Sequence, residues 1–144
     1  MWFFYACAAA LIWGISYAAS GRLLQRGVSP ATLFFLDLLF GLTAMTIYLT
    51  VARKWSAALG EIRGLGGDLK WLAVAVVAAT AGNFLIFLAI EGKSATLASL
   101  IEITYPFFVA LFAWLFFREA QLTWPTAIGG AFVLTGVTII YRYA

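Results

Sequence analysis

Long apolar runs, separated by short polar stretches, dominate the hydrophobic pattern of the chain. Five runs are close to the roughly 20 residues that an α-helix needs to cross the hydrocarbon core of a bilayer. They cover residues 2–24, 31–51, 70–90, 94–117 and 124–142. The runs are continuous and do not alternate with a period of two, which argues against a β-barrel. The pattern therefore predicts an all-α membrane protein, a bundle of five transmembrane helices in a single domain over residues 1–144.

The polar stretches between the runs carry residues that end helices. The turn that follows the first run contains Gly27 and Pro30, and the only long connection, residues 53–68, contains four glycines. Residues 91–93 and 118–121 are expected to be tight turns. We expect no appended soluble domain. We also expect no cleaved signal, because the first residues lack a basic region and the first apolar run is long enough to stay in the bilayer.

Composition narrows the possible chemistry. Hydrophobic residues make up 65% of the chain and charged residues 10%, which excludes a water-soluble globule. Cys7 is the only cysteine and histidine is absent, so no intrachain disulfide and no histidine-based metal site or catalytic triad can form. We therefore expect no catalytic residues, metal or cofactor. The net charge of +3 suits basic loops and does not indicate nucleic-acid binding.

The two membrane faces carry nearly equal numbers of basic residues. The face that holds the N-terminus has five: Arg53, Lys54, Arg63, Lys70 and Arg118. The opposite face has four: Arg22, Arg26, Lys93 and Arg142. The positive-inside rule orients a protein by this difference, so a difference of one is compatible with one orientation and with insertion both ways round. Most tryptophans fall toward the N-terminal face, and we interpret them as interfacial anchors.

Every predicted span places a polar side chain at a similar depth. Two of these are acids, Asp37 and Glu102, which lie roughly 10–13 Å below the face opposite the N-terminus if each residue rises 1.5 Å. Charged side chains inside a bilayer are costly and usually face a bundle interior or a cavity. The pattern predicts a cavity lined by Ser16, Tyr17, Asp37, Asn83, Glu102 and Thr135.

Glu102 is the strongest functional candidate in this layer. Ser99, Tyr105 and Pro106 share its helix face with several alanines, whereas bulky residues form the back of the same helix. Glu102 is therefore expected to point at other helices or a cavity, with Tyr105 beside it. Pro106 frees a backbone carbonyl near Glu102, which either lines the cavity or reflects only a packing kink.

The other candidates have two interpretations each. Ser16, Asn83 and Thr135 are of the kind that hydrogen-bond neighbouring helices, and we favour that role. Asp37 has mostly large neighbours, and it lies either at the cavity or at a dimer contact. Trp13 and Tyr17 either stack on an aromatic or cationic ligand or pack within the bundle.

The position of the acids suggests proton-linked transport. A carboxyl in low-dielectric surroundings can exchange a proton near neutral pH. If a cationic or polar solute competes for that carboxylate, its movement is coupled to proton exchange. Glu102 is predicted to carry proton and substrate, with Asp37 as a second carboxyl or a partner for an arginine.

An ordered set of short motifs resembles the EamA-type domain of the drug/metabolite transporter superfamily. These motifs are LIWGISY at 11–17, SP at 29–30, SATLASL at 94–100, YPFFVAL at 105–111, FFREAQLT at 116–123, GGA at 129–131 and LTGV at 134–137. The resemblance covers nearly the whole chain. It implies a secondary transporter of small metabolites or drugs, usually an exporter, in the bacterial inner membrane. Family members often have an arginine near the position of Asp37, so the acid departs from the pattern and can reverse the preferred ligand charge.

Members of this family typically have ten spans in two inverted halves, and this chain resembles one half. A lone five-span unit can rebuild that arrangement as an antiparallel homodimer, which we prefer over a parallel dimer or a different partner chain. The expected partners are thus a small-molecule substrate, membrane lipid and a second copy, and no nucleic acid. Two alternatives stay open: a non-transporting membrane subunit, in which Glu102 is a structural hydrogen-bonder, and a flippase for a lipid-linked substrate.

Overall fold

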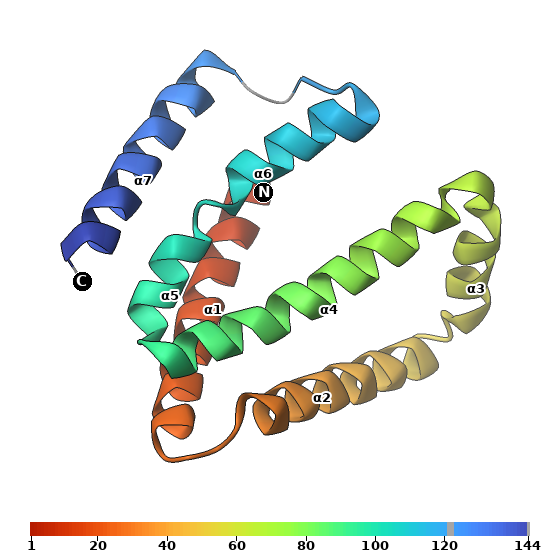
Figure 1. Cartoon of the computed structure of the whole chain (residues 1–144). Helices are drawn as coiled ribbons and strands as arrows, with labels where there is room; N and C mark the ends of the chain where they lie inside the picture. The colour runs from red at the N-terminus through yellow and green to blue at the C-terminus, as the bar shows by residue number, and fades with distance from the viewer. Residues whose placement is uncertain (121–122, 144) are drawn as a thin grey trace.

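The computed structural model describes residues 1–120 and 123–143, which are mostly helical. The elements are α1 (Trp2–Gln25), α2 (Pro30–Val51), α3 (Trp55–Gly64), the 3-10 turn η1 (Gly66–Asp68), α4 (Leu69–Gly92), α5 (Ala95–Glu102), α6 (Tyr105–Phe112), the π-helical turn η2 (Ala113–Phe117) and α7 (Trp124–Tyr143). Five segments within the described residues are long and apolar enough to cross a membrane. The predicted all-α membrane architecture with five spans is confirmed (Figure 1). Gln121, in the last predicted turn, and Leu122 lie outside the described residues.

Local capping explains where the chain reverses. Gly27 has a φ of +89°, a conformation that glycine adopts readily, and its N–H donates to the carbonyl of Leu24 at 2.9 Å, which ends α1. The side chain of Ser29 accepts a hydrogen bond from the Thr32 N–H at 3.2 Å and starts α2. Ser94 caps α5 in the same way. These caps fix the turns that lead into the second and fourth spans.

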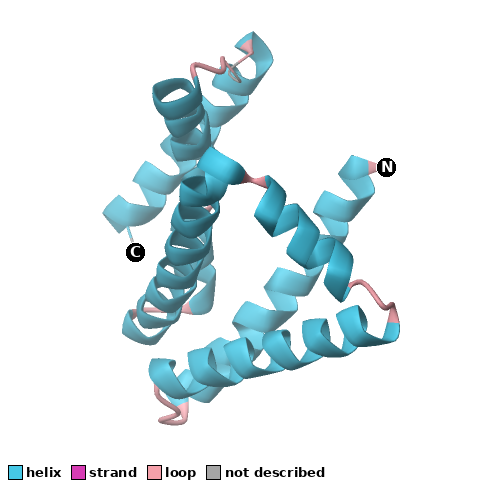
Figure 2. Cartoon of the chain, turned by 90° about the vertical axis from the view of Figure 1, so that its right-hand side faces the viewer, coloured by secondary structure: helices cyan, strands magenta, loops and turns pink. Residues whose placement is uncertain are grey.

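The tightest packing lies near the membrane face opposite the N-terminus. There α4 packs against α1, α2 and α5, and the helices diverge from this corner (Figures 1 and 2). The buried cluster consists of Tyr17, Leu24, Ile86, Ile90 and Ala98. Gly21 permits the close approach of α1 to α5, because a Cβ at this position would lie 3.1 Å from the Cβ of Ala95. This contact sets the spacing between the two helices that carry the site.

The fourth span is broken, whereas the hydrophobic pattern predicts one continuous helix over residues 94–117. Its first part, α5, ends at Glu102, and α6 begins at Tyr105. At the break the N–H of Thr104 donates to the carbonyl of Ile101 at 3.1 Å, a tighter i→i−3 turn. Pro106 has no N–H, so the Glu102 carbonyl receives no helical bond from it. The sequence predicted a freed carbonyl near Glu102. In the structure the α-helix itself is interrupted there, between Glu102 and Tyr105.

The connection between the second and third apolar runs contains a helix that the hydrophobic pattern did not predict. We expected residues 53–68 to be a loop, but α3 occupies Trp55–Gly64 and joins α2 to α4 (Figure 1). Trp55, Leu59 and Ile62 recur at helical spacing on one face of α3, and this signal was present in the sequence. All three side chains are exposed. An apolar face on a helix with basic residues nearby is typical of a segment lying along a membrane surface.

Basic and aromatic side chains pair on the N-terminal face. The Nζ of Lys70 lies 5.5 Å from the ring centroid of Trp71, and the guanidinium of Arg118 lies 5.8 Å from that of Trp114. Lys54 lies 5.5 Å from the ring centroid of Tyr48 and donates a hydrogen bond to its hydroxyl at 3.1 Å. That hydrogen bond raises the pKa of Lys54 above its usual value. Such amphipathic pairs suit the headgroup region, in keeping with the predicted anchors.

Candidate functional site

A hydrogen bond between the first and fourth spans forms the centre of the site. The Tyr17 hydroxyl donates to the Oε2 atom of Glu102 at 2.7 Å. The two residues are 85 positions apart in sequence, so only the packing of α1 against α5 brings them together. Tyr17 is 8% exposed and belongs to the buried cluster, which holds its hydroxyl in place. A short bond to a charged acceptor of this kind is stronger than a neutral one.

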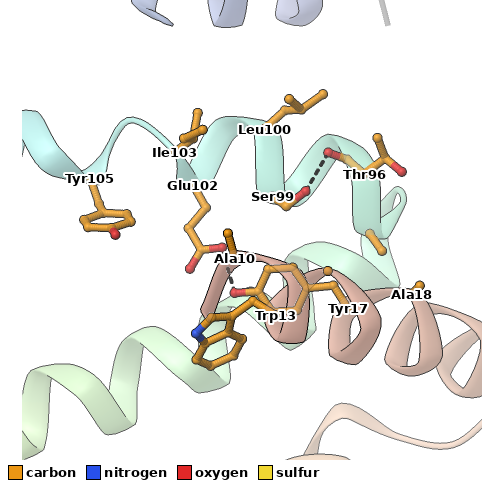
Figure 3. A pocket seen from close by; sticks show the side chains of 12 residues that line it. Ala10, Trp13, Tyr17, Ala18, Thr96, Ser99, Leu100, Glu102, Ile103 and Tyr105 are labelled. Carbon is orange, nitrogen blue, oxygen red and sulfur yellow. Dashed lines mark hydrogen bonds between the residues drawn. The ribbon is translucent and has the colours of Figure 1, made fainter. Parts of the chain in front are cut away.

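The carboxylate of Glu102 faces a pocket of about 480 Å³ between α1 and the start of the fourth span. Figure 3 shows Glu102 pointing from the end of α5 toward Trp13 and Tyr17 on α1. The pocket is lined by Ala10, Trp13, Gly14, Tyr17, Ala18, Ala95, Thr96, Ser99, Leu100, Glu102, Ile103 and Tyr105. We call it the carboxylate pocket.

Aromatic rings surround the carboxylate. Trp13 lies one turn before Tyr17 on α1, and their ring centroids are 5.4 Å apart at an interplanar angle of 56°. Tyr105 begins α6 just beyond the break, and its ring lies on the same side of the fourth span as the Glu102 carboxylate (Figure 3). Ring faces attract cations through their quadrupole. The carboxylate and the faces of the three aromatic rings therefore all favour a positive charge in this pocket.

The charge of the carboxylate pocket is not balanced by a basic side chain. Among the described residues its lining contains one acid, Glu102, and no lysine or arginine. Tyr17 satisfies the Oε2 atom, while the structure gives the other oxygen, Oε1, no hydrogen-bond partner among the described residues. The carboxylate therefore keeps an acceptor available to a proton or a ligand that enters the pocket.

A second pocket, of about 580 Å³, lies between α6 and α7 on the other side of the helix break. It is lined by Ile103, Tyr105, Pro106, Phe107, Val109, Ala110, Thr126, Gly129, Gly130 and Val133, and we call it the apolar pocket. Ile103 and Tyr105 line both pockets. Phe107 packs onto Gly130, where any added Cβ would collide with the ring. The break in the fourth span is thus the boundary between a charged and an apolar compartment.

The predicted polar layer is brought together only in part. Tyr17, Glu102, Trp13 and Tyr105 meet in the carboxylate pocket, but Ser16, Asp37, Asn83 and Thr135 do not line it. Ser16 and Asn83 are half-buried, and Asp37 and Thr135 are exposed. The Thr135 hydroxyl donates to the carbonyl of Ala131 within its own helix at 2.8 Å. Side chains at the same depth in the membrane can face different directions around their helices, and these four do not face the carboxylate pocket. Their functional role stays a prediction.

Two features of the site escaped the sequence analysis. Ala10, Gly14 and Ala18 recur every four residues along α1 and line the carboxylate pocket. Small residues at this spacing usually indicate close helix packing, but here their small side chains leave room for the pocket. The spacing was visible in the sequence. The apolar pocket had no comparable signal, because it depends on the break at residues 103–104 and on how α7 packs.

No group of acidic or cysteine side chains within the described residues has the geometry of a metal site. The arrangement instead offers one available carboxylate, a phenolic donor and aromatic faces inside a membrane-spanning bundle. Such a site can bind a proton or a cation.

Comparison with known proteins identifies a family. The model of the EamA-like transporter family matches residues 1–142 of the chain. No curated protein and no solved structure matches it. The family match covers nearly the whole chain, and it agrees with the five membrane-spanning helices and with the motifs quoted above. The chain therefore belongs to the EamA-like transporter family, a family of membrane transporters in the drug/metabolite transporter superfamily.

Proposed function

We propose that this protein is a secondary transporter that exports a small solute in exchange for protons, across the inner cell membrane in which it sits. The observation that carries the proposal is the Glu102 carboxylate, which has one oxygen bound by Tyr17 and the other available in a pocket. A carboxyl inside a membrane span is expensive to maintain and usually marks an ion or substrate path.

In this cycle the solute and the proton compete for one group. When the pocket opens to the cell interior, the solute binds the charged carboxylate and the proton leaves. When it opens to the outside, a proton replaces the solute, and the neutral carboxyl returns. Because Glu102 cannot hold both at once, downhill proton entry drives solute exit. The Tyr17 hydroxyl donates a hydrogen bond to one oxygen of the Glu102 carboxylate and leaves the other oxygen for the solute or the proton.

The broken fourth span supports an alternating cycle. Transporter sites are often formed by discontinuous helices, whose unpaired backbone groups face the substrate path. Here the interruption directly follows Glu102, and α6 lies beyond it (Figure 1). We propose that the turn at Ile103 and Thr104 lets α6 change its angle to α5, opening the pocket first to one face and then to the other.

The transport function is tested with protein reconstituted into liposomes that carry an imposed pH gradient. Four probes cover the charge classes: benzyltrimethylammonium, tetramethylammonium, phenylalanine and benzenesulfonate. The proposal requires that at least one probe moves against its concentration gradient when protons flow the other way, and stops when a proton ionophore collapses the gradient. Movement of every probe at the rate of protein-free liposomes, with or without the gradient, would count against transport and for a non-transporting subunit.

We further propose that two copies of the chain work together as an antiparallel homodimer. In the single chain, Asp37 lies within the span α2, and its side chain is exposed. It has no hydrogen-bond partner among the described residues. A carboxyl exposed to lipid is costly, so a second five-span unit covering α2 would stabilise it. Five basic residues on one face and four on the other permit insertion of both orientations.

Dual orientation predicts a specific labelling pattern. Gly67 and Gly92 flank the span α4 at opposite membrane faces, and a Cβ at either position meets nothing within 4 Å. On a Cys7→Ser background, Gly67→Cys and Gly92→Cys are each expected to be labelled in about half of the molecules by an impermeant thiol reagent in intact cells. Full labelling at one position and complete protection at the other would establish a single orientation and exclude the antiparallel homodimer.

A further inference from the structure

We infer that the solute is an amphiphilic organic cation, with its cationic head beside Glu102 and its apolar body past Tyr105 in the apolar pocket. This inference rests on the proposed function for the role of the site in transport. It goes further by naming the substrate class and by assigning a binding role to the second pocket.

The sign of the head group follows from the carboxylate pocket. Among the described residues, Glu102 is the only charged one in its lining, and one oxygen of its carboxylate has no protein partner. The rings of Trp13, Tyr17 and Tyr105 add faces that attract a cation. A zwitterion or an anion would bring a negative group that no basic lining residue of either pocket could pair. The pocket thus favours a positive charge and penalises a negative one.

The apolar body of the ligand follows from the second pocket. Its lining contains no charged residue, and only Thr126 and Tyr105 carry side-chain polar atoms. The two pockets share the lining residues Ile103 and Tyr105. A ligand longer than its head group is therefore expected to extend from one pocket into the other along the Tyr105 ring. A ligand confined to the carboxylate pocket would leave the apolar pocket, of about 580 Å³, without a role.

If the head and the body of the ligand occupy separate pockets, the affinity should increase when an apolar body is added to a cationic head. Benzyltrimethylammonium and tetramethylammonium share a quaternary head, but only the first has an aromatic body. Burial of that body in the apolar pocket is expected to strengthen binding by roughly 10- to 100-fold. Phenylalanine, with a similar body and a zwitterionic head, is expected to bind weakly or not at all, and so is benzenesulfonate.

The test blocks one compartment and leaves the other intact. Gly129 lines the apolar pocket, and a Cβ there meets nothing within 4 Å, so Gly129→Leu fills the pocket without a backbone clash. Gly136 lies on the same helix, α7, is equally unobstructed and lines neither pocket. Gly136→Leu is therefore the matched control for the change from glycine to leucine.

Equilibrium dialysis of the full-length protein in dodecyl maltoside micelles, with empty micelles as blank, measures each affinity. Gly129→Leu is expected to weaken benzyltrimethylammonium roughly tenfold and to leave tetramethylammonium unchanged, while Gly136→Leu changes neither. Retained tetramethylammonium binding shows that the variant is folded. Equal affinity of the wild type for both cations, binding of phenylalanine as tight as that of the cation, or an equal loss of both cations in Gly129→Leu would overturn the inference.

These outcomes separate the inference from the proposed function. If the protein exchanges protons for phenylalanine or benzenesulfonate in liposomes, the proposed function stands and the cationic substrate class is wrong. If both cations bind as expected but no probe moves with the pH gradient, the binding site stands and the transport cycle is wrong.

Discussion

Glu102→Gln is expected to abolish transport driven by a pH gradient, lowering the initial rate roughly 100-fold or more. Glutamine has nearly the same size and keeps an oxygen that can accept the Tyr17 hydrogen bond, seen at 2.7 Å in the wild type. It has no charge to attract a solute and no proton to exchange. The variant should therefore fold and insert normally while losing both the binding charge and the coupling. Flux of the probe that the wild type transports, measured in liposomes, checks this.

The matched control is Glu91→Gln, which removes a carboxylate from the exposed end of α4, outside both pockets. It is expected to transport at the wild-type rate. Glu102→Asp is informative too, because it keeps the charge but moves it by one methylene, so weak but proton-coupled transport is expected. Gradient-driven transport by Glu102→Gln at the wild-type rate would mean that another group carries the proton.

Tyr17→Phe is expected to weaken transport without abolishing it. The Tyr17 hydroxyl donates a hydrogen bond to the Glu102 carboxylate at 2.7 Å and so fixes the direction in which the carboxylate faces the pocket. A hydrogen bond to a charged group contributes about 1.5–3 kcal/mol, so its loss is expected to lower the transport rate by roughly 10- to 100-fold. The initial rate of probe flux in liposomes provides the measurement.

Tyr105→Phe is the control for this effect. Tyr105 lines the same pocket, but the structure gives its hydroxyl no hydrogen bond to Glu102. Removal of that hydroxyl is expected to leave the transport rate unchanged. A wild-type rate in Tyr17→Phe, or an equal loss in both variants, would show that the hydrogen bond does not position the carboxylate.

The number and type of spans could be predicted from the sequence because they depend on a one-dimensional quantity. A run of about 20 apolar residues is a helix that crosses the bilayer, whatever its neighbours are. Gly27 and Ser29 also act locally, through a left-handed turn and a cap, so the first reversal was predictable. The helix α3 carried an equally local signal in Trp55, Leu59 and Ile62.

The rotation of each helix about its axis depends on three-dimensional packing, and there the sequence was less informative. The depth of Glu102 and the small residues on its face predicted an inward orientation, and its carboxylate faces a pocket. Asp37 lies at nearly the same depth, but α2 packs mainly on α4, and the acid is exposed. Nothing local distinguishes these two acids except the size of their neighbours.

The extent of the helix break also could not be predicted from the sequence. Pro106 predicted a lost hydrogen bond, but a proline in a membrane helix produces anything from a mild kink to an interruption. At the break the Thr104 hydroxyl donates to the carbonyl of Ile101 at 2.9 Å, which adds to the stability of the tight turn. The apolar pocket follows from that interruption.

If Glu102 exchanges a proton for the solute, binding of the solute releases a proton that can be counted. Purified wild-type protein in weakly buffered micelles is mixed with whichever of the four probes it binds, and the pH change is recorded across a titration. We expect about one proton to be released per bound solute at low pH, and the release to fall to zero as the pH rises. Saturating binding of a probe without proton release at any pH would mean that Glu102 does not exchange a proton for the solute.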